Sequence, residues 1–213
     1  MQEDFTKEVK LKSKFFVNVY ETLESIVMAI ALVLIVFVFF AKLSVVDGDS
    51  MVPTLNDKEY LIVSNPFFSY EPDNGDIVVI QTTTTSSTGE KSPLTIVKRV
   101  IATGGQTVEL EYGMFNQFNP TFNVYVDGVL VEENYAYYSG RPLPIRPSDV
   151  HPEFKTLSFE VPEGCVFVLG DNRNVSYDSR YDTLGEGGFI KESEIIGKVV
   201  FRILPLQKLG SIK

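Results

Sequence analysis

The chain has 213 residues, of which 44% are hydrophobic, and carries a formal net charge of −9 at pH 7. This length allows one core of fair size together with a small appendage. The negative charge argues against a nucleic-acid-binding surface, which needs many cations opposite the phosphates. Cys165 is the single cysteine, so the chain cannot form an internal disulfide. Because no cysteine–histidine cluster exists, we expect no metal and no cofactor.

The N-terminal region combines a charged tail with a long apolar run. Residues 1–24 carry charges of both signs and are predicted to form a short cytoplasmic tail. Ser25 to Ala41 contains no charged residue, and as a helix it would measure about 25 Å against a hydrocarbon core of about 30 Å. Lys42 can snorkel while Leu43 extends the apolar contact. We therefore predict one transmembrane helix over residues 25–43.

Two other interpretations of the apolar run are less consistent with its flanks. A cleavable signal peptide would have a shorter charged head, and Phe39-Phe40-Ala41-Lys42 offers no small-x-small cleavage site. A buried core helix seldom lacks a polar face over this length. Lysines precede the span at positions 7, 10, 12 and 14, and only Lys42 closely follows it. This asymmetry predicts a single-pass cell-membrane protein with a cytoplasmic N-terminus and an extracytoplasmic domain over residues 44–213.

The remainder of the chain has the composition of short β-strands separated by turns. Strands are predicted at 60–64, 76–82, 94–102, 107–111, 157–161, 164–169 and 195–204, with an Asp-Gly hairpin within 123–131. The polar stretch 82–92 is predicted to form a flexible hairpin tip, and 135–155 to be irregular. Residues 112–159 are predicted to form a small inserted β subdomain. The fold class is therefore mainly β, antiparallel, with one N-terminal helix.

The stretch Val45-Val-Asp-Gly-Asp-Ser-Met-Val-Pro-Thr-Leu55 presents a serine in a stiff frame directly after the apolar run. Gly48 can adopt backbone angles forbidden to other residues, and Pro53 fixes its own φ. Ser50 is a candidate nucleophile, but a serine needs a group that removes its proton.

Two residues are candidates for this base. His151 is the single histidine and lies in a proline-containing stretch with no periodic pattern, so we expect a solvated loop histidine. Lys98 lies in an apolar strand, where burial disfavours the charged amine. Lowering its pKa from about 10.4 by about three units would make it a usable base. A snorkelling lysine is the alternative that the strand alone leaves open.

A third stretch follows the apolar strand Val166–Leu169. Gly170-Asp-Asn-Arg173 and then Ser176, Asp178, Ser179 and Arg180 supply many hydrogen-bonding groups. Together with Ser50-Met51-x-Pro53-Thr54-Leu55 and Lys98-Arg99, these residues resemble, in order, the boxes of bacterial type I signal peptidases. That family comprises membrane-bound serine proteases with a Ser-Lys dyad, which remove signal peptides from exported preproteins. The resemblance covers nearly the whole chain.

The resemblance implies a role for each matching residue. Ser50 is expected to be the nucleophile, Lys98 the general base, and the Ser50 backbone N–H an oxyanion donor. Ser176 is expected to orient Lys98. Gly48 stands where some members carry a second, hydroxyl donor. An ion network supporting the site is expected from Asp171, Asp178 and Arg180.

Substrate binding is expected beside the dyad, with signal peptides and membrane lipid as the partners. The peptide would pair with neighbouring strands, and shallow apolar pockets for small side chains such as alanine would be formed by Val46, Met51, Leu55, Leu61 and Val97. Ser50 lies at most about 30 Å along the chain from Ala41, which suits a scissile bond near the membrane. A non-enzymatic binding module should lack the dyad, and a self-cleaving regulator resembling the SOS repressors should carry a basic DNA-binding module.

Overall fold

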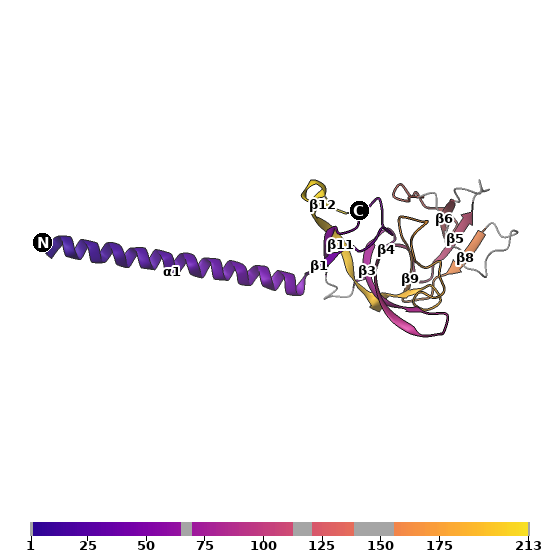
Figure 1. The fold of residues 1–213 in the computed structure, drawn as a ribbon, viewed down its shortest axis with the longest axis horizontal. Helices are drawn as coiled ribbons and strands as arrows, with labels where there is room; N and C mark the ends of the chain where they lie inside the picture. Colours follow the sequence, from indigo (N-terminus) through magenta and orange to yellow (C-terminus); the bar gives the residue numbers. More distant parts are fainter. Residues whose placement is uncertain (1, 65–69, 113–120, 139–155, 213) are drawn as a thin grey trace. The chain divides into compact units, whose positions relative to one another are not determined.

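The computed structural model describes residues 2–64, 70–112, 121–138 and 156–212 (Figure 1). The chain forms two compact units, Met1–Ala41 and Lys42–Lys213. His151 lies outside the described residues.

The N-terminal unit contains one helix, α1, over Gln2–Phe39. Within α1, Phe16–Ile35 is long and apolar enough to cross a membrane. Neither glycine nor proline occurs before Gly48, so nothing in the tail interrupts the helix. The predicted span 25–43 extends too far, because α1 ends at Phe39 and strand β1 begins at Ala41. Pairing of β1 with β2 converts the last predicted residues of the span into strand.

In its described residues, the second unit is built on an eight-stranded sheet. Its order is β1-β2-β11-β3-β4-β9-β10, and β12 pairs with β11. The strands are β1 (Ala41–Val45), β2 (Tyr60–Ser64), β3 (Ile77–Thr85), β4 (Lys91–Thr103), β9 (Cys165–Leu169), β10 (Ile190–Lys191), β11 (Ile195–Leu204) and β12 (Gly210–Ser211). The 3₁₀ helices η2 (Glu192–Glu194) and η3 (Leu206–Lys208) flank β11.

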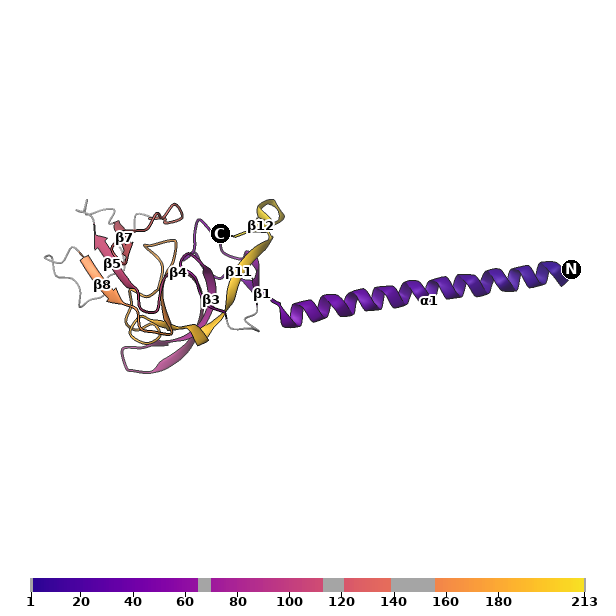
Figure 2. The same ribbon diagram turned by 180° about the vertical axis from the view of Figure 1, so that it is seen from behind.

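A second sheet has the order β7-β6-β5-β8. Its strands are β5 (Thr107–Tyr112), β6 (Phe122–Val126), β7 (Val129–Leu130) and β8 (Thr156–Glu160). Figures 1 and 2 show this sheet at the side of the unit away from β1 and β11. It is more extensive than the predicted subdomain 112–159, because β5 begins directly after the Gly104-Gly105 turn. Phe167 and Leu169 of β9 share its core, so the two sheets pack on each other.

The mainly antiparallel β prediction is confirmed, with β3, β4, β9 and β11 pairing antiparallel. The hairpin predicted around 82–92 is present, but its tip is shorter than predicted and covers residues 86–90. β3 and β4 remain paired from Thr82↔Leu94 to Thr85↔Lys91. Threonine is β-branched and favours extended backbone, so a polar composition did not prevent strand formation here.

Candidate active site

Lys98 and Ser50 are in direct contact. The Nζ atom of Lys98 donates a hydrogen bond to Ser50 Oγ at 2.8 Å and another to the Val97 carbonyl at 2.9 Å. Lys98 lies on β4, and Ser50 lies in the turn that follows β1. A lysine amine and a serine hydroxyl at this separation can exchange a proton.

The turn that carries Ser50 is fixed by local hydrogen bonds. Gly48 has a φ of 89°, a value that glycine adopts without strain, and its N–H donates to Asp57 Oδ1 at 2.8 Å. On the other side of Ser50, the Leu55 N–H donates to the Met51 carbonyl at 2.9 Å. Met51 and Leu55 are buried in the core with Val46 and Val63. The nucleophile candidate therefore stands on a segment whose two ends are anchored.

Burial sets the electrostatic state of Lys98. The residue is only 2% exposed, and this desolvation lowers the pKa of Lys98 to about 8. The Asp178 and Asp171 carboxylates oppose this change, while the Arg180 guanidinium adds to it. The amine therefore loses its proton far more readily than a solvated lysine does.

Asn172 holds the peptide groups on both sides of Ser50. Its backbone N–H donates to the Ser50 carbonyl at 3.0 Å, and its Nδ2 donates to the Asp49 carbonyl at 3.1 Å. In a trans peptide the C=O and the following N–H point in opposite directions. By holding the Asp49 carbonyl, Asn172 also fixes the direction of the Ser50 N–H.

Gly170 leaves room for this arrangement. A Cβ atom at this position would lie 2.5 Å from the Ser50 carbonyl oxygen and would also collide with the Ser176 side chain. The turn that begins at Gly170 can therefore approach the Ser50 segment only because residue 170 has no side chain.

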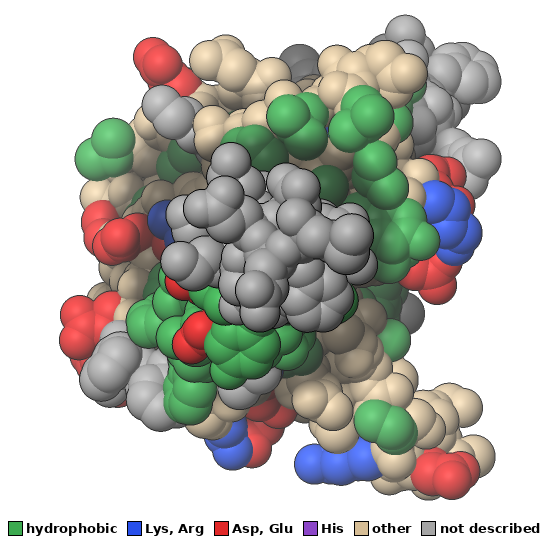
Figure 3. Space-filling model, turned by 90° about the vertical axis from the view of Figure 1, so that its left-hand side faces the viewer, with side chains coloured by type: hydrophobic (Ala, Val, Ile, Leu, Met, Phe, Trp, Pro, Cys, Tyr) green, Lys and Arg blue, Asp and Glu red, His purple; other side chains and the backbone are tan. Residues whose placement is uncertain are grey.

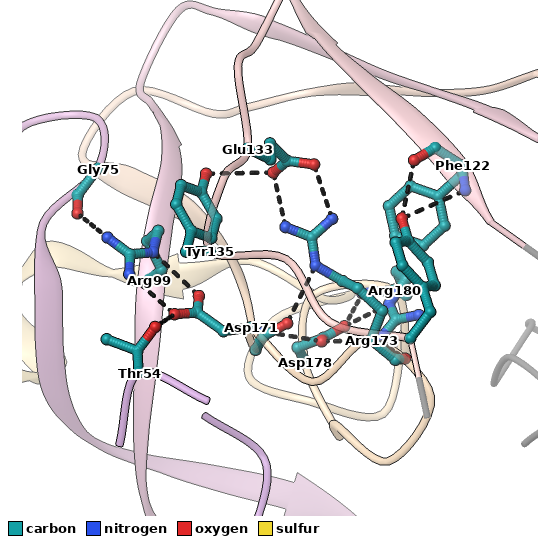
Figure 4. Close-up of polar contacts among 12 residues, drawn as sticks. Thr54, Gly75, Arg99, Phe122, Glu133, Tyr135, Asp171, Arg173, Asp178 and Arg180 are labelled. Atoms are coloured by element: carbon teal, nitrogen blue, oxygen red, sulfur yellow. Dashed lines mark hydrogen bonds and ion pairs between the residues drawn. The ribbon is translucent and has the colours of Figure 1, made fainter. Parts of the chain in front are cut away.

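Two buried ion pairs lie next to the dyad. Arg99 grips Asp171 with two hydrogen bonds, from Nε at 2.9 Å and Nη2 at 2.8 Å, and Asp171 also accepts from Thr54 Oγ1 at 2.5 Å (Figure 4). Arg180 Nε donates to Asp178 Oδ1 at 2.7 Å. The three residues expected to form an ion network, Asp171, Asp178 and Arg180, thus belong to two ion pairs, in which Arg99 is the partner of Asp171 and Arg180 the partner of Asp178.

The Asp178 carboxylate is completely buried. Burial alone would raise the pKa of Asp178, but the Arg180 charge and the Gly170 N–H, which donates to Asp178 Oδ2 at 3.0 Å, lower it below its usual value. Asp178 therefore remains ionised and balances the buried Arg180 guanidinium.

Ser176 is buried beside Gly170 and Asp178, but the expected hydrogen bond to Lys98 is not formed. Within the described part of the chain, the Ser176 hydroxyl has no hydrogen bond to the amine, whose partners are Ser50 and Val97. In this arrangement the Val97 carbonyl, rather than Ser176, orients Lys98.

Two pockets meet at the dyad. One, of about 360 Å³, is lined by Ser50, Lys98 and by Gly48, Asp49, Leu94, Ile96, Val175 and Tyr177. The other, of about 100 Å³, also borders Ser50 and Lys98 and is lined by residues 44–47, Met51, Val79 and 95–97. The smaller pocket has room for a small side chain.

The pocket residues correct part of the predicted substrate set. Val46, Met51 and Val97 line the smaller pocket. Leu55 and Leu61 line neither pocket, and both side chains are 0% exposed in the core beneath the Ser50 segment. These two leucines therefore belong to the core, because their apolar neighbours enclose them completely.

Several residues of the site were not assigned a role from the sequence. Arg99 was visible next to Lys98, and strand alternation indicates that it points to the opposite face. Thr54 and Asn172 lie within the quoted motifs, but only the folded structure brings them to Asp171 and Ser50. Glu133 and Tyr135, described below, have no local signal, since they lie in a stretch without periodic pattern.

Comparison with known proteins identifies the family of the chain. A family profile described as "Signal peptidase, peptidase S26" matches residues 19–204. The chain is 33% identical over 209 residues to Signal peptidase I of Bacillus amyloliquefaciens, covering 97% of this chain and 95% of the relative. It is 32% identical over 216 residues to Signal peptidase I T of Bacillus subtilis (strain 168), covering 100% of both. A Probable signal peptidase I-1 of a Synechocystis species is 32% identical over 194 residues, covering 90% of this chain and 86% of the relative.

A profile that covers most of the chain, together with relatives above 30% identity over nearly their whole lengths, shows the family. The chain belongs to the signal peptidase family, peptidase S26.

Proposed function

We propose that this serine endopeptidase removes signal peptides from exported preproteins, with Ser50 as nucleophile and Lys98 as general base. The observation that carries the proposal is the 2.8 Å contact between Ser50 Oγ and the buried Lys98 Nζ. With a pKa of about 8, roughly a tenth of the Lys98 amines are neutral at pH 7. An unperturbed lysine would be neutral in roughly one molecule in three thousand.

The reaction proceeds in two proton-coupled stages. Neutral Lys98 accepts the Ser50 hydroxyl proton while Oγ attacks the scissile carbonyl carbon. As the C–N bond breaks, the Lys98 ammonium returns this proton to the leaving amine, and the signal peptide remains esterified to Ser50. Lys98 then removes a proton from water, the hydroxide attacks the ester, and Ser50 Oγ leaves with the proton that Lys98 holds.

The developing oxyanion needs a donor that is fixed in advance. We assign this role to the Ser50 backbone N–H, whose direction is set through the Asp49 carbonyl by Asn172. The Gly48 N–H is already donated to Asp57, and residue 48 has no hydroxyl. A second donor would therefore come from another group or from water.

We further propose that the substrate binds as an extended strand. β4 pairs with β9 over Arg99–Thr103, and in the described part of the chain this pairing does not extend to residues 94–98. Those residues line both pockets at the dyad. A peptide that adds to this edge would place alternate side chains in the pockets. The 100 Å³ volume of the smaller pocket favours a residue such as alanine before the scissile bond.

We propose a single-pass anchor, with the N-terminus in the cytoplasm and the catalytic unit outside. The apolar segment Phe16–Ile35 and the preceding lysines support this orientation. The catalytic unit exposes large hydrophobic side chains that suit a position near lipid, among them Leu43, Val45, Leu204, Leu206 and Leu209. Figure 3 shows a face on which hydrophobic side chains lie in groups between acidic and basic ones.

The test compares the full chain in detergent micelles with its Ser50→Ala and Lys98→Ala variants, each incubated with a preprotein. Both variants should bind the preprotein but cleave it at least about 10³-fold more slowly. Cleavage by either variant at the wild-type rate would remove the dyad from the mechanism.

A further inference from the structure

The segment that follows β7 of the second sheet is hydrogen-bonded to the turn whose Asn172 holds the peptide groups around Ser50. We name residues 131–138, which follow β7, the brace, and residues 170–173 the clamp turn. The Tyr137 N–H donates to the Asp171 carbonyl at 2.7 Å, and the Arg173 N–H donates to the Tyr137 carbonyl at 2.9 Å. At the end of the brace, the Tyr138 hydroxyl donates to the Phe122 carbonyl of β6 at 2.8 Å. The clamp turn is thereby attached to the second sheet.

Glu133 of the brace forms a buried ion pair with Arg173 of the clamp turn. Two hydrogen bonds join them, from Arg173 Nη2 at 2.6 Å and from Nη1 at 3.0 Å. The Glu133 side chain is only 8% exposed and the Arg173 side chain 0%. Arg173 Nε also donates to the Gly170 carbonyl at 3.1 Å. Glu133 therefore fixes the guanidinium that holds the first residue of the clamp turn.

Tyr135 connects the same brace to the second ion pair. Its hydroxyl donates to Glu133 Oε1 at 3.1 Å, and its ring lies over the Arg99 guanidinium, 3.8 Å from Cζ to the ring centroid. Figure 4 shows Tyr135 between Glu133 and Arg99. Because Arg99 holds Asp171, the ring covers the group that fixes the second residue of the clamp turn.

The third residue of the clamp turn, Asn172, holds the carbonyls of Asp49 and Ser50. We infer that Glu133 and Tyr135 are positioning residues for the nucleophile: they hold the clamp turn, and the clamp turn aims the Ser50 hydroxyl and N–H. This inference rests on the proposed function. Neither side chain lines either of the two dyad pockets. Loss of the brace contacts should therefore reduce kcat and leave substrate binding nearly unchanged.

The experiment measures kcat and KM for preprotein cleavage by the full chain in detergent, at a temperature where each variant remains folded by circular dichroism. Tyr135→Leu removes the ring over Arg99, whereas Tyr135→Phe keeps the ring and removes only the hydroxyl. Tyr137→Leu is the matched control, because the exposed Tyr137 holds the clamp turn through its backbone. Glu133→Asp withdraws the carboxylate by one methylene and keeps its charge, and the exposed Glu132→Asp is its control.

We expect Tyr135→Leu and Glu133→Asp to lower kcat about tenfold or more with KM within about twofold, since a shift of about 1 Å in a reacting group can cost about 10²-fold. Tyr135→Phe should restore kcat to within about threefold of wild type, and both controls should match wild type.

If Tyr135→Leu does not fold, the result for Glu133→Asp decides. A purely stabilising role predicts a lower melting temperature with an unchanged kcat for folded enzyme, and that result would overturn the inference. Ser50→Ala and Lys98→Ala are measured in parallel. Wild-type activity in these variants would refute the proposed dyad, whereas their inactivity beside an unaffected brace variant would refute this inference alone.

Discussion

Lys98 and Arg99 are neighbours on β4, yet they hold two different groups of the catalytic unit. Lys98 contacts the Ser50 hydroxyl at 2.8 Å, and Arg99 grips Asp171, which accepts a hydrogen bond from Thr54. Strand alternation sends the two side chains to opposite faces. β4 therefore holds the nucleophile segment at two points. Lys98 contacts the Ser50 hydroxyl, and Arg99 acts through Asp171 on Thr54, in the corner that follows Ser50.

The pH dependence of cleavage should respond to the charge of Asp178. Its carboxylate raises the pKa of Lys98, although burial outweighs it and brings that pKa down to about 8. Asp178→Asn removes this attraction, so the Lys98 pKa should fall further and the rising limb of kcat/KM should move to lower pH. The measurement is kcat/KM from pH 5.5 to 10 on the folded enzyme. A limb that moves to higher pH would contradict the electrostatic assignment.

The same substitution should destabilise the fold. Asp178→Asn leaves Arg180 buried without its countercharge, and the loss of one partner of a buried pair costs about 3–5 kcal/mol. Thermal unfolding in detergent should show a clear fall in melting temperature. Glu186→Gln is the control, because the Glu186–Lys191 pair is exposed and its loss should change stability little.

Lys98 should be a site where activity is obtained at the expense of stability. Its pKa of about 8, against 10.5 for the ordinary amine, corresponds to about 3 kcal/mol of unfavourable burial. This cost is complete below pH 8, where folded and unfolded chains both bind the proton. Between about pH 8 and 10.5 the unfolded chain binds more protons, so stability rises with pH and the cost disappears.

Lys98→Met should accordingly unfold at a higher temperature than wild type at pH 7, and this difference should shrink as the pH approaches 10.5. The variant should also be inactive. Lys91→Met, at an exposed position of the same strand, provides the comparison and should show neither effect. A Lys98→Met variant less stable than wild type at pH 7 would show that the buried amine stabilises the fold.

Substitutions of the core leucines and of the pocket residues should have different effects, the first on stability and the second on substrate selection. Leu61→Ala removes a fully buried core side chain and should lower stability by about 2–5 kcal/mol without changing the cleavage site. Val97→Phe places a larger side chain at the wall of the 100 Å³ pocket and reduces the space left for the substrate. This variant should raise KM or shift cleavage toward a smaller residue. Sequencing of product N-termini together with thermal unfolding distinguishes the two. A new cleavage site in Leu61→Ala would return that residue to the substrate pocket.

The sequence predicted those features that depend on local pattern. β2 and β11 occur at 60–64 and 195–204 as expected, because turn residues flank each apolar run or the run alternates clearly between apolar and polar residues. The hairpin tip within 82–92 was predicted too long, since pairing between β3 and β4 overrides the polar composition of its two ends. The end of the helix was placed too late because β1 pairs with β2, which no local pattern reveals.

The site shows the same division. Ser50 and Lys98 carry chemically distinctive signals within motifs, and the structure brings them into contact. Leu55 and Leu61 could not be separated from pocket residues, because core and pocket use the same side chains. The partnership of Arg99 with Asp171 and the brace contacts of Glu133 and Tyr135 connect segments far apart in the chain. Such pairings become visible only when the sheets are assembled.

The state of the Lys98 amine is the central claim, and it can be observed directly. The enzyme is labelled with ¹³C at the lysine Cε positions, and its NMR spectrum is recorded in detergent from pH 6 to 11, with Lys98→Met used to assign the Lys98 signal. The structure predicts that the Lys98 signal titrates near pH 8, well below the value of about 10.4 for an unperturbed lysine. If the Lys98 signal titrated at about pH 10.4, as an unperturbed lysine does, the amine would be charged at neutral pH and could not act as the proposed base.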